Sequence, residues 1–145
     1  MGFSLKFPYQ INPAYSKSVA YFCMEFGIHQ PLKTYAGGLG FLAGSHMRSA
    51  YELKQNILGI GILWKYGYYD QVRKPDQTMD VLFQEKVYGF LEKIDVKITI
   101  KVSGHEVAVT AYYLPPHVFK TAPIFFLSTE IAENDYLAKT ICHHL

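Results

Sequence analysis

The sequence of 145 residues contains no apolar run long enough to cross a membrane. Its longest such run, residues 57–64, is less than half of the roughly 20 apolar residues that a spanning helix needs. The first 18 residues also lack the apolar stretch of a secretory signal. The sequence therefore gives no reason to expect export or a membrane partner, and we predict a cytoplasmic protein.

The chain is also poor in charge and in cysteine. Charged residues make up 18% of it, and the 14 Lys and Arg are scattered among 12 Asp and Glu, so no basic patch indicates a nucleic-acid partner. Its two cysteines, Cys23 and Cys142, lie far apart and form no C-x-x-C pair. We interpret both as buried thiols rather than as a disulfide.

What the chain has in abundance is apolar and aromatic side chains. Half of its residues are hydrophobic and 16% are aromatic, which is far above the content of a disordered chain. Its length is sufficient to bury one core. We therefore predict a folded chain with a single domain.

The first half of the chain predicts a strand, a helix and a second strand. Residues 18–23 form a short apolar run typical of a buried strand, and residues 57–63 form a nearly continuous one, typical of a strand covered on both faces. Alternation places Gly59 and Gly61 on one face, where a helix is able to approach closely. The helix between the strands has apolar positions at helical spacing: Leu39, Leu42, Ala43, Met47, Ala50 and Leu53. Together they predict a βαβ unit of the α/β class with a right-handed crossover.

The second half predicts an antiparallel hairpin and one more buried strand. Residues 95–102 and 105–113 alternate strictly around Ser103-Gly104, and residues 124–127 are apolar. Asn134 is a candidate N-cap for a final helix that carries an apolar stripe to the end of the chain, from which we expect a larger protein. Residues 65–74 predict a loop or short strand, and residues 79–91 fit either a helix or a strand.

The glycine-rich stretch from Gly37 to Gly40 lies between the first strand and the helix. Glycines at such a position let the backbone turn tightly and approach a ligand, and the first N–H groups and the dipole of the helix favour an anion such as phosphate. The same glycines also suit a turn that binds nothing. Both readings stay open at this point.

Longer stretches around these glycines resemble the α-glucan phosphorylases, the family of glycogen, starch and maltodextrin phosphorylases. The resemblance covers about residues 19–145. Its most specific segments are Ala20-Tyr-Phe-Cys-Met-Glu-Phe-Gly-Ile-His-Gln30, Tyr35-Ala-Gly-Gly-Leu-Gly-Phe-Leu-Ala-Gly-Ser-His46 and Gly59-Ile-Gly-Ile-Leu-Trp-Lys-Tyr-Gly-Tyr-Tyr-Asp-Gln71. The hairpin and residues 124–135 look like the continuation of the same N-terminal domain.

The resemblance implies a glycosyltransferase B fold with two domains, of which residues 1–145 form part of the N-terminal, Rossmann-like one with an inserted antiparallel hairpin. It implies an active site between the domains, with α-glucan and phosphate as substrates and a pyridoxal 5′-phosphate cofactor whose phosphate does the acid–base work. On this basis the cofactor-binding residues are Gly37, Gly38 and Gly40, and the substrate-binding residues are Glu25, Leu39 and His46. Glu25 serves equally well as a carboxylate that only holds the glycine turn by hydrogen bonds.

Some positions depart from the family. Ser45 and Gln30 stand where related short bacterial phosphorylases often carry acidic residues. The substrate or the activity of this protein could therefore differ from that of the family. The cofactor lysine belongs to the family's second domain, so this chain alone is expected to be inactive. The histidines His29, His46, His143 and His144 lack metal-ligand spacing, and we predict no metal site.

Two alternatives remain beside a phosphorylase segment that transfers a terminal α-1,4-glucosyl unit to phosphate and yields glucose 1-phosphate. One is a sugar-nucleotide-dependent glucan synthase, because such enzymes carry a similar glycine loop. The other is a stand-alone glucan-binding or regulatory module, in which Tyr66, Tyr68 and Tyr69 stack on sugar rings. If the chain is instead part of a larger protein, the rest of that protein would cover the apolar strand at residues 57–63. We therefore expect the isolated chain to self-associate, whereas a strict monomer would favour the stand-alone module.

Overall fold

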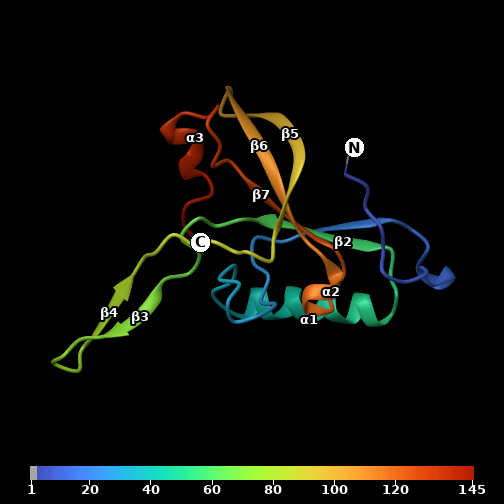
Figure 1. The fold of residues 1–145 in the computed structure, drawn as a ribbon, viewed down its shortest axis with the longest axis horizontal. Helices are drawn as coiled ribbons and strands as arrows, with labels where there is room; N and C mark the ends of the chain where they lie inside the picture. Colours follow the sequence, from blue (N-terminus) through green and yellow to red (C-terminus); the bar gives the residue numbers. More distant parts are fainter. Residues whose placement is uncertain (1–2) are drawn as a thin grey trace.

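The computed structural model describes residues 3–145, which form a mixed α/β architecture (Figure 1). The elements are β1 (Val19–Phe22), α1 (Gly38–Glu52), β2 (Ile57–Ile62), β3 (Asp70–Arg73), β4 (Met79–Leu82), β5 (Glu92–Val102), β6 (His105–Leu114), α2 (Pro116–Phe119), β7 (Ile124–Ser128) and α3 (Tyr136–Thr140), with a 3-10 turn at Pro13–Tyr15. The predicted α/β class is confirmed. Among the helices that the structure describes, none combines the length and apolar character of a membrane span.

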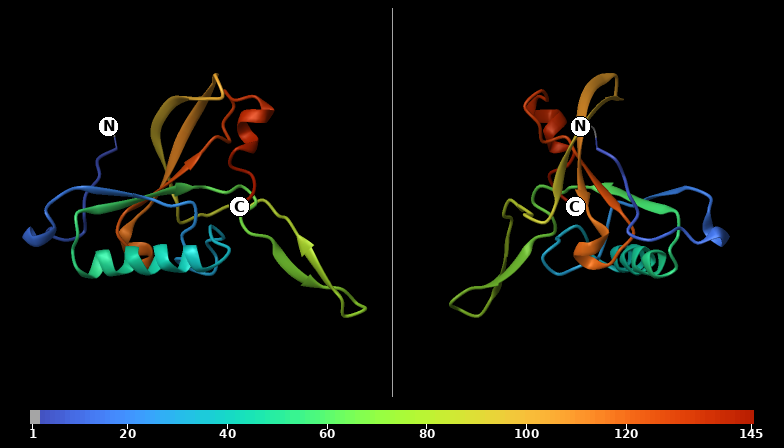
Figure 2. Two further views of the ribbon diagram at one scale, coloured as in Figure 1. Left: turned by 180° about the vertical axis from the view of Figure 1, so that it is seen from behind. Right: turned by 45° about the vertical axis from the view of Figure 1, so that its right-hand side comes forward.

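The main sheet has five strands in the order β1-β2-β7-β6-β5. Strands β1, β2 and β7 run parallel, as the predicted βαβ unit requires, whereas β6 and β5 are antiparallel to their neighbours. The remaining strands, β3 and β4, form a separate antiparallel pair that projects away from the sheet (Figures 1 and 2). This projecting pair occupies residues to which the sequence assigned no definite structure.

Helix α1 covers one face of the sheet, on the glycine side of β2 (Figure 2). A Cβ added at Gly59 would lie 3.2 Å from the Met47 sulfur and 3.2 Å from the Phe26 ring, and one at Gly61 would lie 2.9 Å from that ring. The glycines therefore make room for Met47 of the helix and for Phe26 of the loop before it. This confirms the close approach predicted from their shared face.

The loop after β1 crosses the start of α1 at backbone distance. Gly27 donates a hydrogen bond of 2.8 Å to the carbonyl oxygen of Gly40, and a Cβ at Gly44 would collide with the carbonyl group of Gly27. The buried face of α1 consists of small residues and one methionine: Gly40, Ala43, Gly44, Met47 and Ala50. Leu39, Leu42 and Leu53, which helical spacing also assigned to the packed face, are 47–65% exposed, so that part of the prediction is wrong.

The first strand is an edge strand, and the prediction that it is buried is wrong. Val19 and Phe22 are 45% and 72% exposed, because β1 pairs only with β2. The prediction that β2 is covered on both faces is also wrong, since Leu58, Ile60 and Ile62 are only half-buried. Phe3, from the segment before β1, packs edge-on against Tyr113 and Phe125 elsewhere on this open face.

The predicted hairpin is confirmed as β5 and β6. Its two-residue turn has positive φ at both Ser103 (51°) and Gly104 (84°), which matches the twist of the flanking strands. The predicted strand at residues 124–127 is β7, and it is central and largely buried. Asn134, however, is not the N-cap of the last helix.

Asp135 caps α3 instead, by accepting a hydrogen bond of 2.8 Å from the Ala138 amide. Asn134 is buried and bonds to both backbone groups of Ala108 in β6, which fixes the segment after β7 along that strand. Both cysteines are free thiols; Cys142 is buried as predicted, whereas Cys23 is only half-buried. The final helix is short. Its predicted apolar stripe consists of Leu137, Ile141 and Leu145, and Leu137 is 73% exposed.

The contact between Gly27 and Gly44 generates a stability prediction. Gly44→Ala should lower the free energy of unfolding by about 2 kcal/mol, because the added methyl group meets the Gly27 backbone. This loss should appear although Ala favours a helix by about 1 kcal/mol over Gly. Chemical denaturation of both variants measures it, with Ser45→Ala, at an exposed position of the same helix, as control. A more stable Gly44→Ala variant would contradict the packing described.

Candidate functional site

The loops that follow the parallel strands meet at one edge of the sheet. Glu25 lies in the loop after β1, Lys65 follows β2, and Glu130 follows β7. The indole nitrogen of Trp64, after β2, donates a hydrogen bond of 2.9 Å to the carbonyl oxygen of Met24 and so joins two of these loops. Open α/β sheets bind ligands beyond the carboxyl ends of their parallel strands. This edge is therefore the place where a ligand site is expected.

Glu25 holds the turn that leads into α1. Its Oε2 accepts hydrogen bonds from the backbone amides of Ala36 (3.0 Å) and Gly37 (3.3 Å). A carboxylate at this place also interacts favourably with the positive end of the helix dipole. From the sequence, Glu25 was expected either to contact substrate or to hold the glycine turn by hydrogen bonds. One of its two carboxylate oxygens makes such hydrogen bonds to the turn.

Gly37 and Gly38 form the open part of the turn. Gly37 is the N-cap of α1 with extended backbone angles (φ −158°, ψ −151°), and Gly38 is the first helical residue. A Cβ added at either position meets nothing within 4 Å, and neither residue has a positive φ. Neither the fold nor the backbone conformation therefore requires glycine here. The open space over this turn is available to a ligand.

Gly40 has a different environment. A Cβ at this position would collide with that of Tyr35, and its carbonyl oxygen receives the hydrogen bond from Gly27. Gly40 is buried, whereas Gly38 is exposed. Its position in the structure is accordingly that of a packing residue behind the turn.

The other predicted site residues lie further along the helix. Leu39 is 50% exposed beside Gly38, at the start of α1. His46 is half-buried and packs against Tyr21 of β1, with ring centroids 5.0 Å apart. His46 lies eight positions after Gly38, which corresponds to about 12 Å along the helix axis. The structure thus brings Glu25, Gly37, Gly38 and Leu39 together and leaves His46 apart from them.

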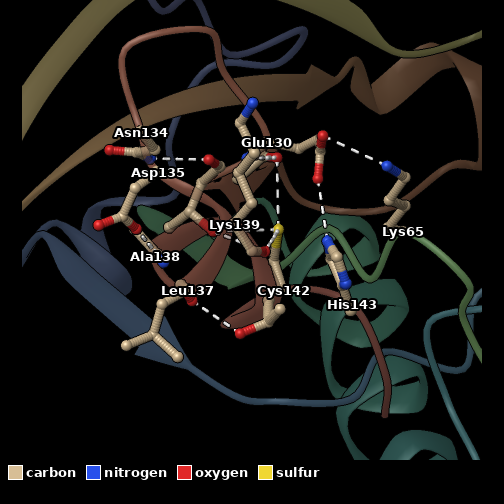
Figure 3. A network of polar contacts seen from close by, with 12 residues as sticks. Lys65, Glu130, Asn134, Asp135, Leu137, Ala138, Lys139, Cys142 and His143 are labelled. Atoms are coloured by element: carbon tan, nitrogen blue, oxygen red, sulfur yellow. Dashed lines mark hydrogen bonds and ion pairs between the residues drawn. The ribbon is translucent and has the colours of Figure 1, made fainter.

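A second polar cluster lies at the same edge of the sheet, at the ends of β2 and β7 (Figure 3). Glu130 accepts from the Lys65 ammonium group through Oε1 (3.2 Å) and from the His143 ring through Oε2 (3.0 Å). Backbone hydrogen bonds from Lys65 to Cys142 and from Tyr66 to His143 align the C-terminal segment with the end of β2. Sequence reasoning missed this cluster, because its three members are contributed by segments that only the sheet brings together.

The charges of this cluster stabilise one another. Desolvation raises the pKa of Glu130, but the hydrogen bonds from His143 and Lys65 outweigh it and hold this pKa below its ordinary value. Desolvation likewise lowers the pKa of Lys65, and the contact with Glu130 outweighs it, so the Lys65 pKa is raised. Glu130 and Lys65 are both charged at neutral pH. Within residues 3–145, no group of three or more His, Cys, Asp and Glu side chains is arranged to hold a metal ion.

The sequence of this chain is similar to segments of several known proteins. No family model matches the chain. A maltodextrin phosphorylase of Thermococcus litoralis is 31% identical over 141 residues, which cover 92% of this chain and 17% of that protein. A glycogen phosphorylase of Mycobacterium tuberculosis is 27% identical over 138 residues, or 88% of this chain and 15% of that protein. An uncharacterized protein of Methanocaldococcus jannaschii is 56% identical over 129 residues, or 89% of this chain and 25% of that protein.

These relatives confirm the resemblance noted from the sequence motifs. The similarity to the two phosphorylases extends over 88–92% of the chain, well beyond the glycine-rich stretch. The chain spans 15–25% of the length of these relatives. Their activity as whole proteins therefore comes to this chain only as a proposal.

The hydrogen bonds of Glu25 generate a prediction about the turn. In Glu25→Ala the amides of Ala36 and Gly37 lose their acceptor, and we expect them to exchange with solvent at least about tenfold faster. Amide hydrogen exchange followed by NMR measures this. Glu25→Gln, which retains a side-chain oxygen as acceptor, should restore much of the protection. Unchanged exchange of these two amides in Glu25→Ala would show that the carboxylate does not hold the turn.

Proposed function

From its relation to the α-glucan phosphorylases, we propose that this chain forms part of the N-terminal domain of an enzyme of that kind. The reaction is transfer of a terminal α-1,4-linked glucosyl unit of a glucan to orthophosphate, which yields glucose 1-phosphate. The observation that carries the proposal is the open turn at Gly37 and Gly38, held by Glu25 at the carboxyl edge of the parallel strands. The segment supplies one wall of the active-site cleft.

The proposed fold of the whole enzyme is a glycosyltransferase B fold, in which residues 1–145 are part of the first, Rossmann-like domain. The parallel β1-α1-β2 unit extended by β7 supports this assignment. The small share of each phosphorylase that the chain covers, 15–17%, supports a second domain elsewhere in the protein. A sugar-nucleotide-dependent synthase receives no such support, since the matched relatives with named activities are phosphorylases.

The turn suits a phosphate because it places backbone donors at the start of α1, next to the Gly37 amide that Glu25 already holds. The first N–H groups of α1 have no acceptor within the helix, and they lie at the positive end of its dipole. Phosphate oxygens are bound well by such a terminus. The exposed side of Gly38 lets a phosphate come to backbone distance.

The same geometry bears on pyridoxal 5′-phosphate, the cofactor that the resemblance implies. The open space at Gly37 and Gly38 fits a phosphate group of either substrate or cofactor, and the backbone amide of Gly38 would hold it, since the Gly37 amide donates to Glu25. When bound, the cofactor supplies a phosphate group for acid–base chemistry. Gly40, packed behind the turn, supports Gly37 and Gly38 in this role.

The remaining predicted residues take roles that follow from their positions. Glu25 keeps the turn in place, and its second carboxylate oxygen is available to a sugar hydroxyl. Leu39 presents an exposed apolar side chain for contact with a sugar ring next to the phosphate. His46 binds substrate only if the cleft extends along α1 as far as Tyr21, against which its ring packs. We further propose a cytoplasmic location and self-association through the open face of the sheet, on which Phe22 is 72% exposed.

The chain by itself should be inactive under this proposal. The lysine that binds the cofactor and the basic residues that grip the substrate phosphate are assigned by the resemblance to the second domain. Incubation of the 145-residue chain with pyridoxal 5′-phosphate, glycogen and orthophosphate should release no glucose 1-phosphate. Release of glucose 1-phosphate, or an imine absorbance that survives dialysis, would contradict the proposal that the second domain supplies these residues.

Gly38 provides the direct test of the proposed site. In the full-length enzyme, Gly38→Val should lower turnover by about 100-fold, because the new side chain fills the space of the phosphate and blocks its backbone donors. The domain should remain folded, since a Cβ at this position meets nothing within 4 Å. Initial rates of glucose 1-phosphate release measure the effect. Ser49→Val, at an exposed position of the same helix, is the matched control for placing Val in a helix. Equal turnover of Gly38→Val and parent would mean that the turn binds no reacting group.

A further inference from the structure

A cleft of about 510 Å³ lies beside the C-terminal segment, where the ends of β2 and β7 meet α3. Its volume is within the range of small-molecule sites in proteins. None of the residues of the glycine turn lines it. The cleft is therefore a separate feature of the carboxyl edge, and the proposed phosphate site does not use it.

Aromatic rings form the walls of this cleft. Tyr66 and His144 stack with centroids 4.9 Å apart and planes 20° apart, and Phe83 meets His144 edge-on at 5.3 Å. These contacts fix the ring positions. Phe83 and Tyr136 also line the cleft, and they are 52% and 79% exposed. Exposed aromatic rings at the rim of a cleft offer apolar faces to a ligand that carries both C–H and O–H groups.

The polar part of the cleft is the Lys65–Glu130–His143 cluster, shown in Figure 3. An ionised carboxylate has about four acceptor positions, and Lys65 and His143 use one position on each of the two Glu130 oxygens. The side chains of Glu130 and His143 are 32% and 13% exposed, so the group is ordered yet reachable. Glu130 is thus a fixed acceptor with capacity for hydroxyl groups.

The ion pair between Lys65 and Glu130 inside the cleft favours a neutral ligand over an anion. Glu130 holds the Lys65 ammonium group at 3.2 Å, so this cation is not free to attract a phosphate. Lys139, the other lysine that lines the cleft, is not part of this ion pair. A phosphate-binding site usually contains several Arg or Lys side chains and no carboxylate among them.

We propose that this cleft binds a neutral pyranose sugar, as a second binding site for the glucan chain. Phe83 and Tyr136 contact the C–H faces of the sugar, and Glu130, held by Lys65 and His143, accepts from its hydroxyl groups. The proposal depends on the proposed function only for the choice of an α-1,4-glucan as the ligand. Because all of these residues lie in this chain, binding does not require a second domain.

Isothermal titration of the 145-residue chain with maltoheptaose tests the site. The parent chain should bind, and Phe83→Ala and Tyr136→Ala should each weaken binding by about tenfold through loss of a ring contact. Tyr15→Ala, which removes another partly exposed aromatic ring outside the cleft, is the matched control and should bind like the parent. Orthophosphate titrated alone should give no heat that depends on Phe83 or Tyr136.

The outcomes separate this site from the glycine turn. No binding by the parent, or binding unaffected by both Phe83→Ala and Tyr136→Ala, overturns the proposal. Loss of binding only in Gly38→Val also overturns it, and leaves the proposed function standing, because the sugar then occupies the turn. NMR chemical shifts of the backbone amides, recorded for the parent chain with and without maltoheptaose, test the cleft without any variant. The amide shifts of Tyr66, Phe83 and Tyr136 should change. Changes confined to other segments would contradict binding in the cleft.

Discussion

The backbone contact between the loop after β1 and the start of α1 is the constraint on which the candidate site depends. Gly27 meets both Gly40 and Gly44 at distances that leave no room for a side chain. Behind this crossing, α1 lies against the glycine face of β2. The helix terminus is thereby fixed at the carboxyl edge of the sheet by packing, and Glu25 adds hydrogen bonds to the turn that precedes it. A ligand at the turn would meet donors that are already in place, which is the condition for effective electrostatic stabilisation.

The two proposed sites, which differ in chemistry, lie at the same edge of the sheet. The glycine turn presents backbone donors and the end of a helix dipole, which suits an anion. The cleft proposed to bind sugar presents the Lys65–Glu130 ion pair beside aromatic rings, which suits an uncharged polyhydroxyl ligand. A glucan phosphorylase needs both kinds of recognition, since one substrate is phosphate and the other is a neutral chain.

The uncovered face of the sheet agrees with a chain that functions beside further structure. Parallel strands are usually buried on both faces, yet only one face of β2 is covered by a helix here, and Phe22 on the neighbouring edge strand is 72% exposed. Under the proposed function, other parts of the enzyme cover this face. In their absence, a second copy of the chain is the natural cover for the same surface.

The sequence by itself determined the βαβ unit, the β5–β6 hairpin and the glycine turn, because each depends on local periodicity or on residues adjacent in the chain. It did not show that β1 is an edge strand, since an apolar run looks the same at the edge and in the centre of a sheet. It assigned Gly37, Gly38 and Gly40 the same cofactor-binding role, although Gly38 faces open space and Gly40 is packed against Tyr35. Only the tertiary structure decided these differences and brought Lys65, Glu130 and His143 together, because strand order and long-range packing set which distant residues become neighbours.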